Sequence, residues 1–94
     1  MTRIAILGST GSIGCNALEV IEHLGSEYRA IALGANRNID RLIAQARKYA
    51  PAAIALGNES LAAELKRRAA DLGARMYVGS PGMVEMVCRE TSAP

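Results

Sequence analysis

The sequence contains no tryptophan and no phenylalanine, and its only aromatic residues are three tyrosines. With a net charge of only +2 and basic residues scattered along the chain, it offers neither the basic face nor the stacking platform of a nucleic-acid-binding protein. It also has no apolar run of about eighteen residues and no secretory signal, which argues against a membrane span. Its two cysteines share no motif spacing and indicate a reducing compartment. We therefore expect a cytoplasmic protein that binds neither nucleic acid nor membrane.

What is present is a repeated pattern of a short apolar run followed by a stretch with helical spacing of apolar residues. The predicted strands are residues 4–7, 28–33, 52–56 and 76–78. The predicted helices follow each strand; Gly25, Pro51 and Gly73 end the first three. The last helix is predicted to begin with Ser80 as N-cap and Pro81 as first helical residue, and the tail 88–94 is predicted to be a loop.

Strands with an almost uninterrupted apolar character are typical of a parallel sheet that is covered on both faces. The pattern predicts an α/β fold, a Rossmann-like parallel sheet with helices on both faces, incomplete at about four βα units. Residues 1–94 would form the first part of such a domain. The first strand is predicted to lie beside the second and the second beside the third, whereas the place of the fourth stays open.

Three glycines at one spacing, Gly8, Gly11 and Gly14, occupy the turn after the first predicted strand. In a nucleotide-binding turn, Gly8 would let the chain leave the strand sharply, Gly11 would let a pyrophosphate approach the backbone, and Gly14 would let the helix pack closely on the sheet. Backbone N–H groups at the helix start would then face the anion. The alternative is a structural turn without a ligand.

Two hydroxyl side chains, Thr10 and Ser12, stand in this loop and can donate to the same anion, although either can instead cap the helix. The loop is one residue longer than in the usual dinucleotide fingerprint, where the second glycine comes one position earlier. Several dehydrogenase families and some CoA-binding domains share such a turn. The motif thus indicates a pyrophosphate rather than a particular reaction.

The second loop, "GANRN" at residues 34–38, contains no carboxylate where an NAD site would have one for the ribose hydroxyls. Arg37 stands there instead and can grip a 2′-phosphate, with support from Asn36 or Asn38. Arg37 could also be a surface charge, and Asn38 the N-cap of the next helix. Together with the glycine loop, the missing acid favours NADP.

The remaining candidates indicate no chemistry of their own. His23 is predicted to be a cation at a helix end, and Cys15 a residue packed in the first helical turn. The sequence shows no metal-ligand spacing, no paired carboxylates and no nucleophile–base set, so no catalytic or metal-binding residue is assigned.

The segments "ILGSTGSIG" and "LGANRN" together resemble the N-terminus of the 1-deoxy-D-xylulose-5-phosphate reductoisomerase family. This resemblance covers essentially the whole chain. It implies an NADPH-dependent oxidoreductase that uses a divalent metal, Mg or Mn, to convert 1-deoxy-D-xylulose 5-phosphate to 2-C-methyl-D-erythritol 4-phosphate in non-mevalonate isoprenoid biosynthesis. A homodimer is expected for the complete enzyme.

By position, the resemblance places the NADPH contacts on seven residues of the two loops. They are Thr10, Gly11, Ser12, Ile13, Asn36, Arg37 and Asn38. Many relatives have glycine in place of Asn36 and lysine in place of Arg37, so the arginine keeps the charge while the backbone contact at Asn36 is in doubt.

Family members are much longer, and their metal ligands and substrate-phosphate site match nothing in these 94 residues. The chain is therefore expected to be the cofactor-binding portion of such an enzyme and inactive by itself. Two alternatives stay open: the cofactor domain of another NADP-dependent dehydrogenase with a GxxGxxG turn, and a nonenzymatic nucleotide- or CoA-binding module.

Overall fold

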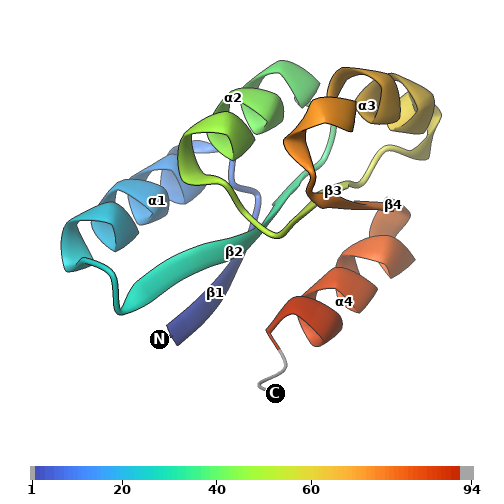
Figure 1. Ribbon diagram of the computed structural model, residues 1–94. Helices are drawn as coiled ribbons and strands as arrows, with labels where there is room; N and C mark the ends of the chain where they lie inside the picture. The colour runs from blue at the N-terminus through green and yellow to red at the C-terminus, as the bar shows by residue number, and fades with distance from the viewer. Residues whose placement is uncertain (1, 92–94) are drawn as a thin grey trace.

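Four parallel strands and four α-helices alternate along the chain in a computed structural model that describes residues 2–91 (Figure 1). The strands are β1 (Thr2–Leu7), β2 (Tyr28–Ala35), β3 (Ala53–Leu56) and β4 (Arg75–Val78). The helices are α1 (Ser12–Leu24), α2 (Ile39–Tyr49), α3 (Ala62–Arg68) and α4 (Gly79–Glu90), and short 3₁₀ turns, η1 (Glu59–Leu61) and η2 (Ala70–Leu72), flank α3.

The strands pair in the order β1-β2-β3-β4, and every pair is parallel. This confirms the predicted α/β fold and the predicted neighbours of the first three strands, and it places β4 at the outer edge beside β3. Helices α1, α2 and α3 cover one face of the sheet, while α4 covers the other (Figure 1). Right-handed crossovers between strands that are added in the same direction put their helices on the same face of the sheet, which accounts for α1, α2 and α3. Helix α4 follows β4 and packs against the opposite face.

The two faces of the sheet differ in the size of their side chains. Leu33, Ile54 and Leu56 point toward the three-helix face and are fully buried there with leucines of the helices. Alternate positions of the same strands carry Ala32, Ala53 and Ala55, which pack with Met86 of α4. Because alanine side chains are short, α4 packs close to this face of the sheet, and the flexible Met86 side chain fills the remaining space.

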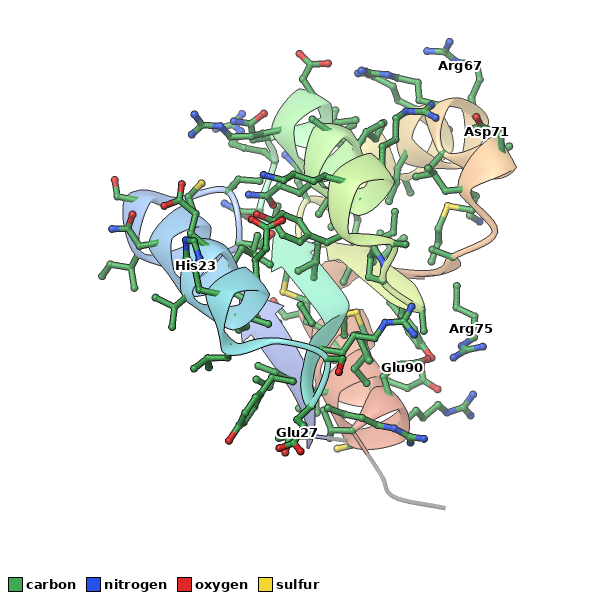
Figure 2. The ribbon with its side chains drawn as sticks, turned by 60° about the vertical axis from the view of Figure 1, so that its left-hand side comes forward. His23, Glu27, Arg67, Asp71, Arg75 and Glu90 are labelled. Atoms are coloured by element: carbon green, nitrogen blue, oxygen red, sulfur yellow. The ribbon has the colours of Figure 1, made fainter. Side chains whose placement is uncertain are left out.

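Helix α4 is also held at its far end by a polar contact (Figure 2). The Glu90 carboxylate is buried and accepts hydrogen bonds from Arg75 Nε at 2.6 Å and from Tyr77 Oη at 3.1 Å. Arg75, with its hydrogen bonds and positive charge, holds the pKa of Glu90 below its ordinary value. The contact ties the last turn of α4 to β4.

Several predicted boundaries are wrong. Strand β1 begins two residues earlier than predicted, at Thr2, and the starts of β3 and β4 differ by one residue each. Strand β2 continues through Ala35, because Gly34 and Ala35 pair with β3. Helix α4 begins at Gly79, so Ser80 and Pro81 lie inside its first turn and Val78 is the N-cap residue. Residues 88–90, predicted as loop, are helical, while residues 92–94 of the predicted tail lie outside the described residues. Within the described part of the chain, no helix combines the length and apolar character needed to cross a membrane.

Candidate nucleotide-binding site

The two loops singled out by the sequence lie side by side at the carboxyl edge of the sheet. The Gly34 carbonyl oxygen near the end of β2 accepts two hydrogen bonds, from the N–H of Gly8 at 2.7 Å and from the N–H of Ser9 at 2.9 Å. The glycine loop that follows β1 is thereby joined to the strand that leads into residues 36–38. Ligands of open α/β sheets bind at this carboxyl edge.

Each glycine of the first loop has a distinct structural setting. Gly8 has φ of +76°, a conformation that side chains disfavour. A Cβ on Gly14 would overlap the carbonyl oxygen of Gly8 and lie 2.6 Å from Cα of Ser9, so helix α1 packs closely against the loop only with glycine there. Gly11 has ordinary extended angles, and a Cβ there would meet only the Gly8 carbonyl oxygen at 3.5 Å. The sharp turn predicted at Gly8 is confirmed, and the close packing predicted for Gly14 is present, but against the loop backbone of Gly8 and Ser9.

The N-terminus of α1 is open. Its N-cap residue is Gly11, no side chain makes a capping hydrogen bond, and the first turn contains no acidic residue. The alternative in which Thr10 or Ser12 caps the helix is therefore not what the structure shows. The first N–H groups of a helix have no intrahelical partner, and here those of Ser12 and Ile13 stand at an exposed helix start. Such a terminus attracts an anion through both hydrogen bonds and the helix dipole.

The second loop carries the predicted cation on the surface. Arg37 is exposed and has no carboxylate partner among residues 2–91. Asp40, the acidic residue in the first turn of α2, is instead bound by Arg68 at 2.6 Å. No carboxylate of the described structure therefore competes with an anionic ligand for the Arg37 guanidinium.

The two asparagines beside Arg37 have local partners. The Asn36 carbonyl oxygen accepts a hydrogen bond from the Asn58 N–H at 2.8 Å. Its side-chain oxygen lies against Gly57, where a Cβ would come within 2.9 Å of it. Asn38 Oδ1 accepts a hydrogen bond from the Arg41 N–H at 3.1 Å, which confirms the helix-capping alternative for Asn38. The Asn38 side chain thus has a structural role whatever else it binds.

Two residues that the sequence analysis missed also contact the glycine loop. Arg41 Nη1 donates to the Thr10 carbonyl oxygen at 3.1 Å, and Gln45 Nε2 donates to the Ser9 carbonyl oxygen at 2.6 Å. A signal for Gln45 was present, because it interrupts the buried apolar stripe that Leu42 and Ala46 form on α2. A polar residue in that position is normally bound to something inside the protein.

The residues set aside by sequence lie as expected. His23 is exposed in the last turn of α1 (Figure 2), and Cys15 is half-buried in the first turn with its thiol 3.6 Å from the Ser9 carbonyl oxygen. Among the described residues, no group of three histidine, cysteine or acidic side chains is arranged to hold a metal ion.

Comparison with known proteins decides the family. The sequence profile of 1-deoxy-D-xylulose 5-phosphate reductoisomerase matches residues 4–93. The chain belongs to this family. The reductoisomerase of Bacteroides fragilis is 48% identical over 85 residues, which are 90% of this chain and 22% of that protein. That of Halothermothrix orenii is 39% identical over 82 residues, 87% of this chain and 21% of the relative. The chain thus spans about a fifth of the length of these reductoisomerases.

Solved reductoisomerase structures have the same fold in the matching region. A reductoisomerase in complex with NADPH, fosmidomycin and magnesium superposes with a TM-score of 0.88 at 32% identity, over 96% of this chain and 22% of the other. The Zymomonas mobilis enzyme in complex with NADPH gives a TM-score of 0.82 at 33% identity, over 89% of this chain and 22% of the other. Membership of the reductoisomerase family argues against the two alternatives, a different GxxGxxG dehydrogenase and a CoA-binding module.

Proposed function

We propose that this chain is the NADPH-binding part of an enzyme that converts 1-deoxy-D-xylulose 5-phosphate to 2-C-methyl-D-erythritol 4-phosphate. The observation that carries the proposal is the pairing of an open helix N-terminus with an exposed arginine across two adjacent strands. Gly8 and Ser9 bind the end of β2, so the open start of α1 and Arg37 flank one stretch of the sheet edge. Related structures that contain NADPH support the choice of this cofactor.

The glycine loop fits the diphosphate of a dinucleotide. Glycine at position 11 leaves the approach to the backbone free, and the N–H groups of Ser12 and Ile13 are available as donors at the helix start. The hydroxyl groups of Thr10 and Ser12 would add further donors. Gly8 and Gly14 serve the site by shaping the loop.

Residues 36–38 fit the phosphorylated ribose of the adenosine half. Arg37 would bind the 2′-phosphate through charge-assisted hydrogen bonds, which an unphosphorylated ribose does not offer. The side-chain N–H₂ groups of Asn36 and Asn38 would donate further hydrogen bonds to this phosphate. In Asn38 only the N–H₂ group is available, because its oxygen already caps α2. The absence of an acid from residues 34–38 removes the repulsion that would exclude a phosphate.

When bound, NADPH supplies the hydride for reduction, whereas the described residues supply only binding and orientation. They contain no set of ligands that fits Mg²⁺ or Mn²⁺. The metal ligands and the site for the phosphorylated substrate are therefore assigned to parts of the complete enzyme outside these residues. Accordingly, we expect the 94-residue chain alone to consume no NADPH when it is mixed with substrate and Mg²⁺, as followed by NADPH absorbance.

Two further properties of the complete enzyme are part of the proposal. It is a homodimer, as the family resemblance implies, and light scattering of the complete protein tests this. It works in the cytoplasm, which is consistent with the two cysteines being free thiols in the structure. Fractionation of cells that produce it would test the second point.

The decisive test exchanges the charge of the proposed phosphate-binding residue. Arg37→Glu is expected to weaken NADPH binding about a hundredfold, close to 2.7 kcal/mol, and to change NADH binding by less than about threefold. Isothermal titration of the chain with each cofactor measures both constants. Arg67→Glu, which makes the same charge change on α3 (Figure 2), is the matched control and should change neither. Equal losses for NADPH and NADH in the Arg37 variant would reject this role.

A further inference from the structure

Two consecutive carbonyl groups of the glycine loop are held by side chains of α2. Arg41 and Gln45 are four residues apart, so they lie on the same face of the helix. Gln45 Nε2 donates to the Ser9 carbonyl oxygen at 2.6 Å and Arg41 Nη1 donates to the Thr10 carbonyl oxygen at 3.1 Å. Helix α2 therefore contacts the glycine loop directly, and it also follows the loop that contains Arg37.

These contacts determine which way the peptide groups of the loop face. Every peptide bond of the described chain is trans, so each carbonyl points away from the N–H of the next residue. Because the Ser9 carbonyl points to Gln45, the Thr10 N–H points away from α2. Holding the Thr10 carbonyl toward Arg41 likewise directs the Gly11 N–H away from α2, where it donates to the Gly8 carbonyl oxygen at 3.1 Å and closes the turn.

The contact from Gln45 is buried, whereas the contact from Arg41 is exposed. Ser9 is fully buried and Gln45 is 9% exposed. Gln45 Nε2 also lies 3.5 Å from the Cys15 thiol in the first turn of α1, so this amide meets both the loop and the helix that follows it. The buried contact is therefore shielded from competition by water, and it is the stronger constraint on the loop.

Within residues 2–91, the Gln45 amide is satisfied on its donor side only. Gln45 Oε1 and Ser9 Oγ are both buried and have no hydrogen-bond partner within the described residues. A buried polar atom without a partner costs about 1–3 kcal/mol, and an apolar side chain of similar length would avoid that cost at Oε1. Such a side chain could not hold the Ser9 carbonyl, which would lose its hydrogen bond from Gln45 and keep, among the described residues, only the contact with the Cys15 thiol at 3.6 Å.

We propose that Gln45 is a positioning residue for dinucleotide binding, acting from α2 through the Ser9 carbonyl to fix the peptide orientation of the glycine loop. The inference rests on the proposed function, because the loop is assigned to the diphosphate. Gln45 does not touch the cofactor. Since NADPH and NADH share the diphosphate, its effect must be the same for both, unlike the effect of Arg37.

The test replaces Gln45 with methionine, which keeps the length of the side chain and removes the donor. Titration of the chain with NADPH and with NADH should show affinities lowered by the same factor, about tenfold or more, at a temperature where the variant is folded. Ala44→Met, which introduces the same residue at the exposed neighbouring position, is the control and should bind as the wild type does. Unchanged affinities in folded Gln45→Met protein, or a loss confined to NADPH, would overturn the proposal.

A second measurement needs no cofactor and separates this proposal from the proposed function. The Ser9–Thr10 peptide that Gln45 holds lies inside the turn that the Gly11 N–H closes on the Gly8 carbonyl. Amide hydrogen exchange followed by NMR should therefore become faster at Gly11 in Gln45→Met than in Ala44→Met, while exchange in the strands stays unchanged. If the wild-type chain binds no NADPH, the proposed function fails, and the exchange data still decide whether Gln45 orders the loop. Equal exchange in the two variants would contradict the role given to Gln45.

Discussion

Helices α1 and α2 begin at the same edge of the sheet, after neighbouring strands, but their N-termini are built differently. The start of α2 is closed by its own chain, because Asn38 Oδ1 accepts the Arg41 N–H and Asp40 lies in the first turn. The start of α1 has glycine at the N-cap, no capping side chain and no acid. The start of α2 has a capping side chain, whereas the first N–H groups of α1 have none. The difference shows that the residues at the N-cap and in the first turn decide whether a helix start is capped, and that the position of the helix in the fold does not decide it.

The largest expected effect comes from adding a side chain where α1 packs closely against the glycine loop. Gly14→Ala would place a methyl group against the backbone of Gly8 and Ser9, which cannot move aside as a flexible side chain would. We expect a loss of about 3 kcal/mol in the free energy of unfolding, despite the better helix propensity of alanine. Urea denaturation followed by circular dichroism measures it. A variant as stable as the wild type would show that the close approach of α1 to the loop is not needed.

The next largest effect is expected on cofactor binding, with no change in folding stability. Gly11→Ala has room for its methyl group and ordinary backbone angles, so its stability should stay within about 0.5 kcal/mol of the wild type. If the diphosphate approaches the backbone there, affinity for NADPH should fall about tenfold or more, near 1.4 kcal/mol. Titration and denaturation of the same preparation measure both quantities. Wild-type affinity would place the diphosphate elsewhere.

The smallest effect tests the closed terminus. Asn38→Ala removes the cap of α2 and should lower the free energy of unfolding by about 1 kcal/mol. Asn38→Asp keeps an acceptor for the Arg41 N–H and should retain the stability, while its charge beside Arg37 should weaken NADPH binding more than NADH binding. Denaturation of both variants, with titration of the second, checks these expectations. Equal loss of stability in both would mean that the side chain does not act as a cap.

Much of the fold follows from local sequence. The uninterrupted apolar runs predicted parallel strands, and the glycine spacing predicted both the sharp turn at Gly8 and the close packing at Gly14, as the structure confirms. These features depend on residues near one another in the chain. The assignment of a nucleotide to Thr10–Ile13 and Asn36–Asn38 stays a prediction that the binding experiments address.

Other features depend on residues that are distant in sequence. Residues 34–35 read as loop but belong to β2, because β3 supplies their hydrogen-bonding partners. In the last turn of α4, Glu90 accepts hydrogen bonds from Arg75 and Tyr77, and no pattern within residues 88–90 predicts this contact. Gln45 appears in the sequence only as a polar residue on an apolar face.

By itself, the sequence determined the order of strands and helices and the turn that opens α1, because backbone conformation at glycine and the periodicity of apolar residues are local properties. Only the tertiary structure decided that α4 covers the opposite face, that β4 forms the outer edge, and that α2 holds the glycine loop through Arg41 and Gln45. Those outcomes depend on which surfaces and hydrogen-bonding groups meet once the chain has folded, and chain order alone does not specify such meetings.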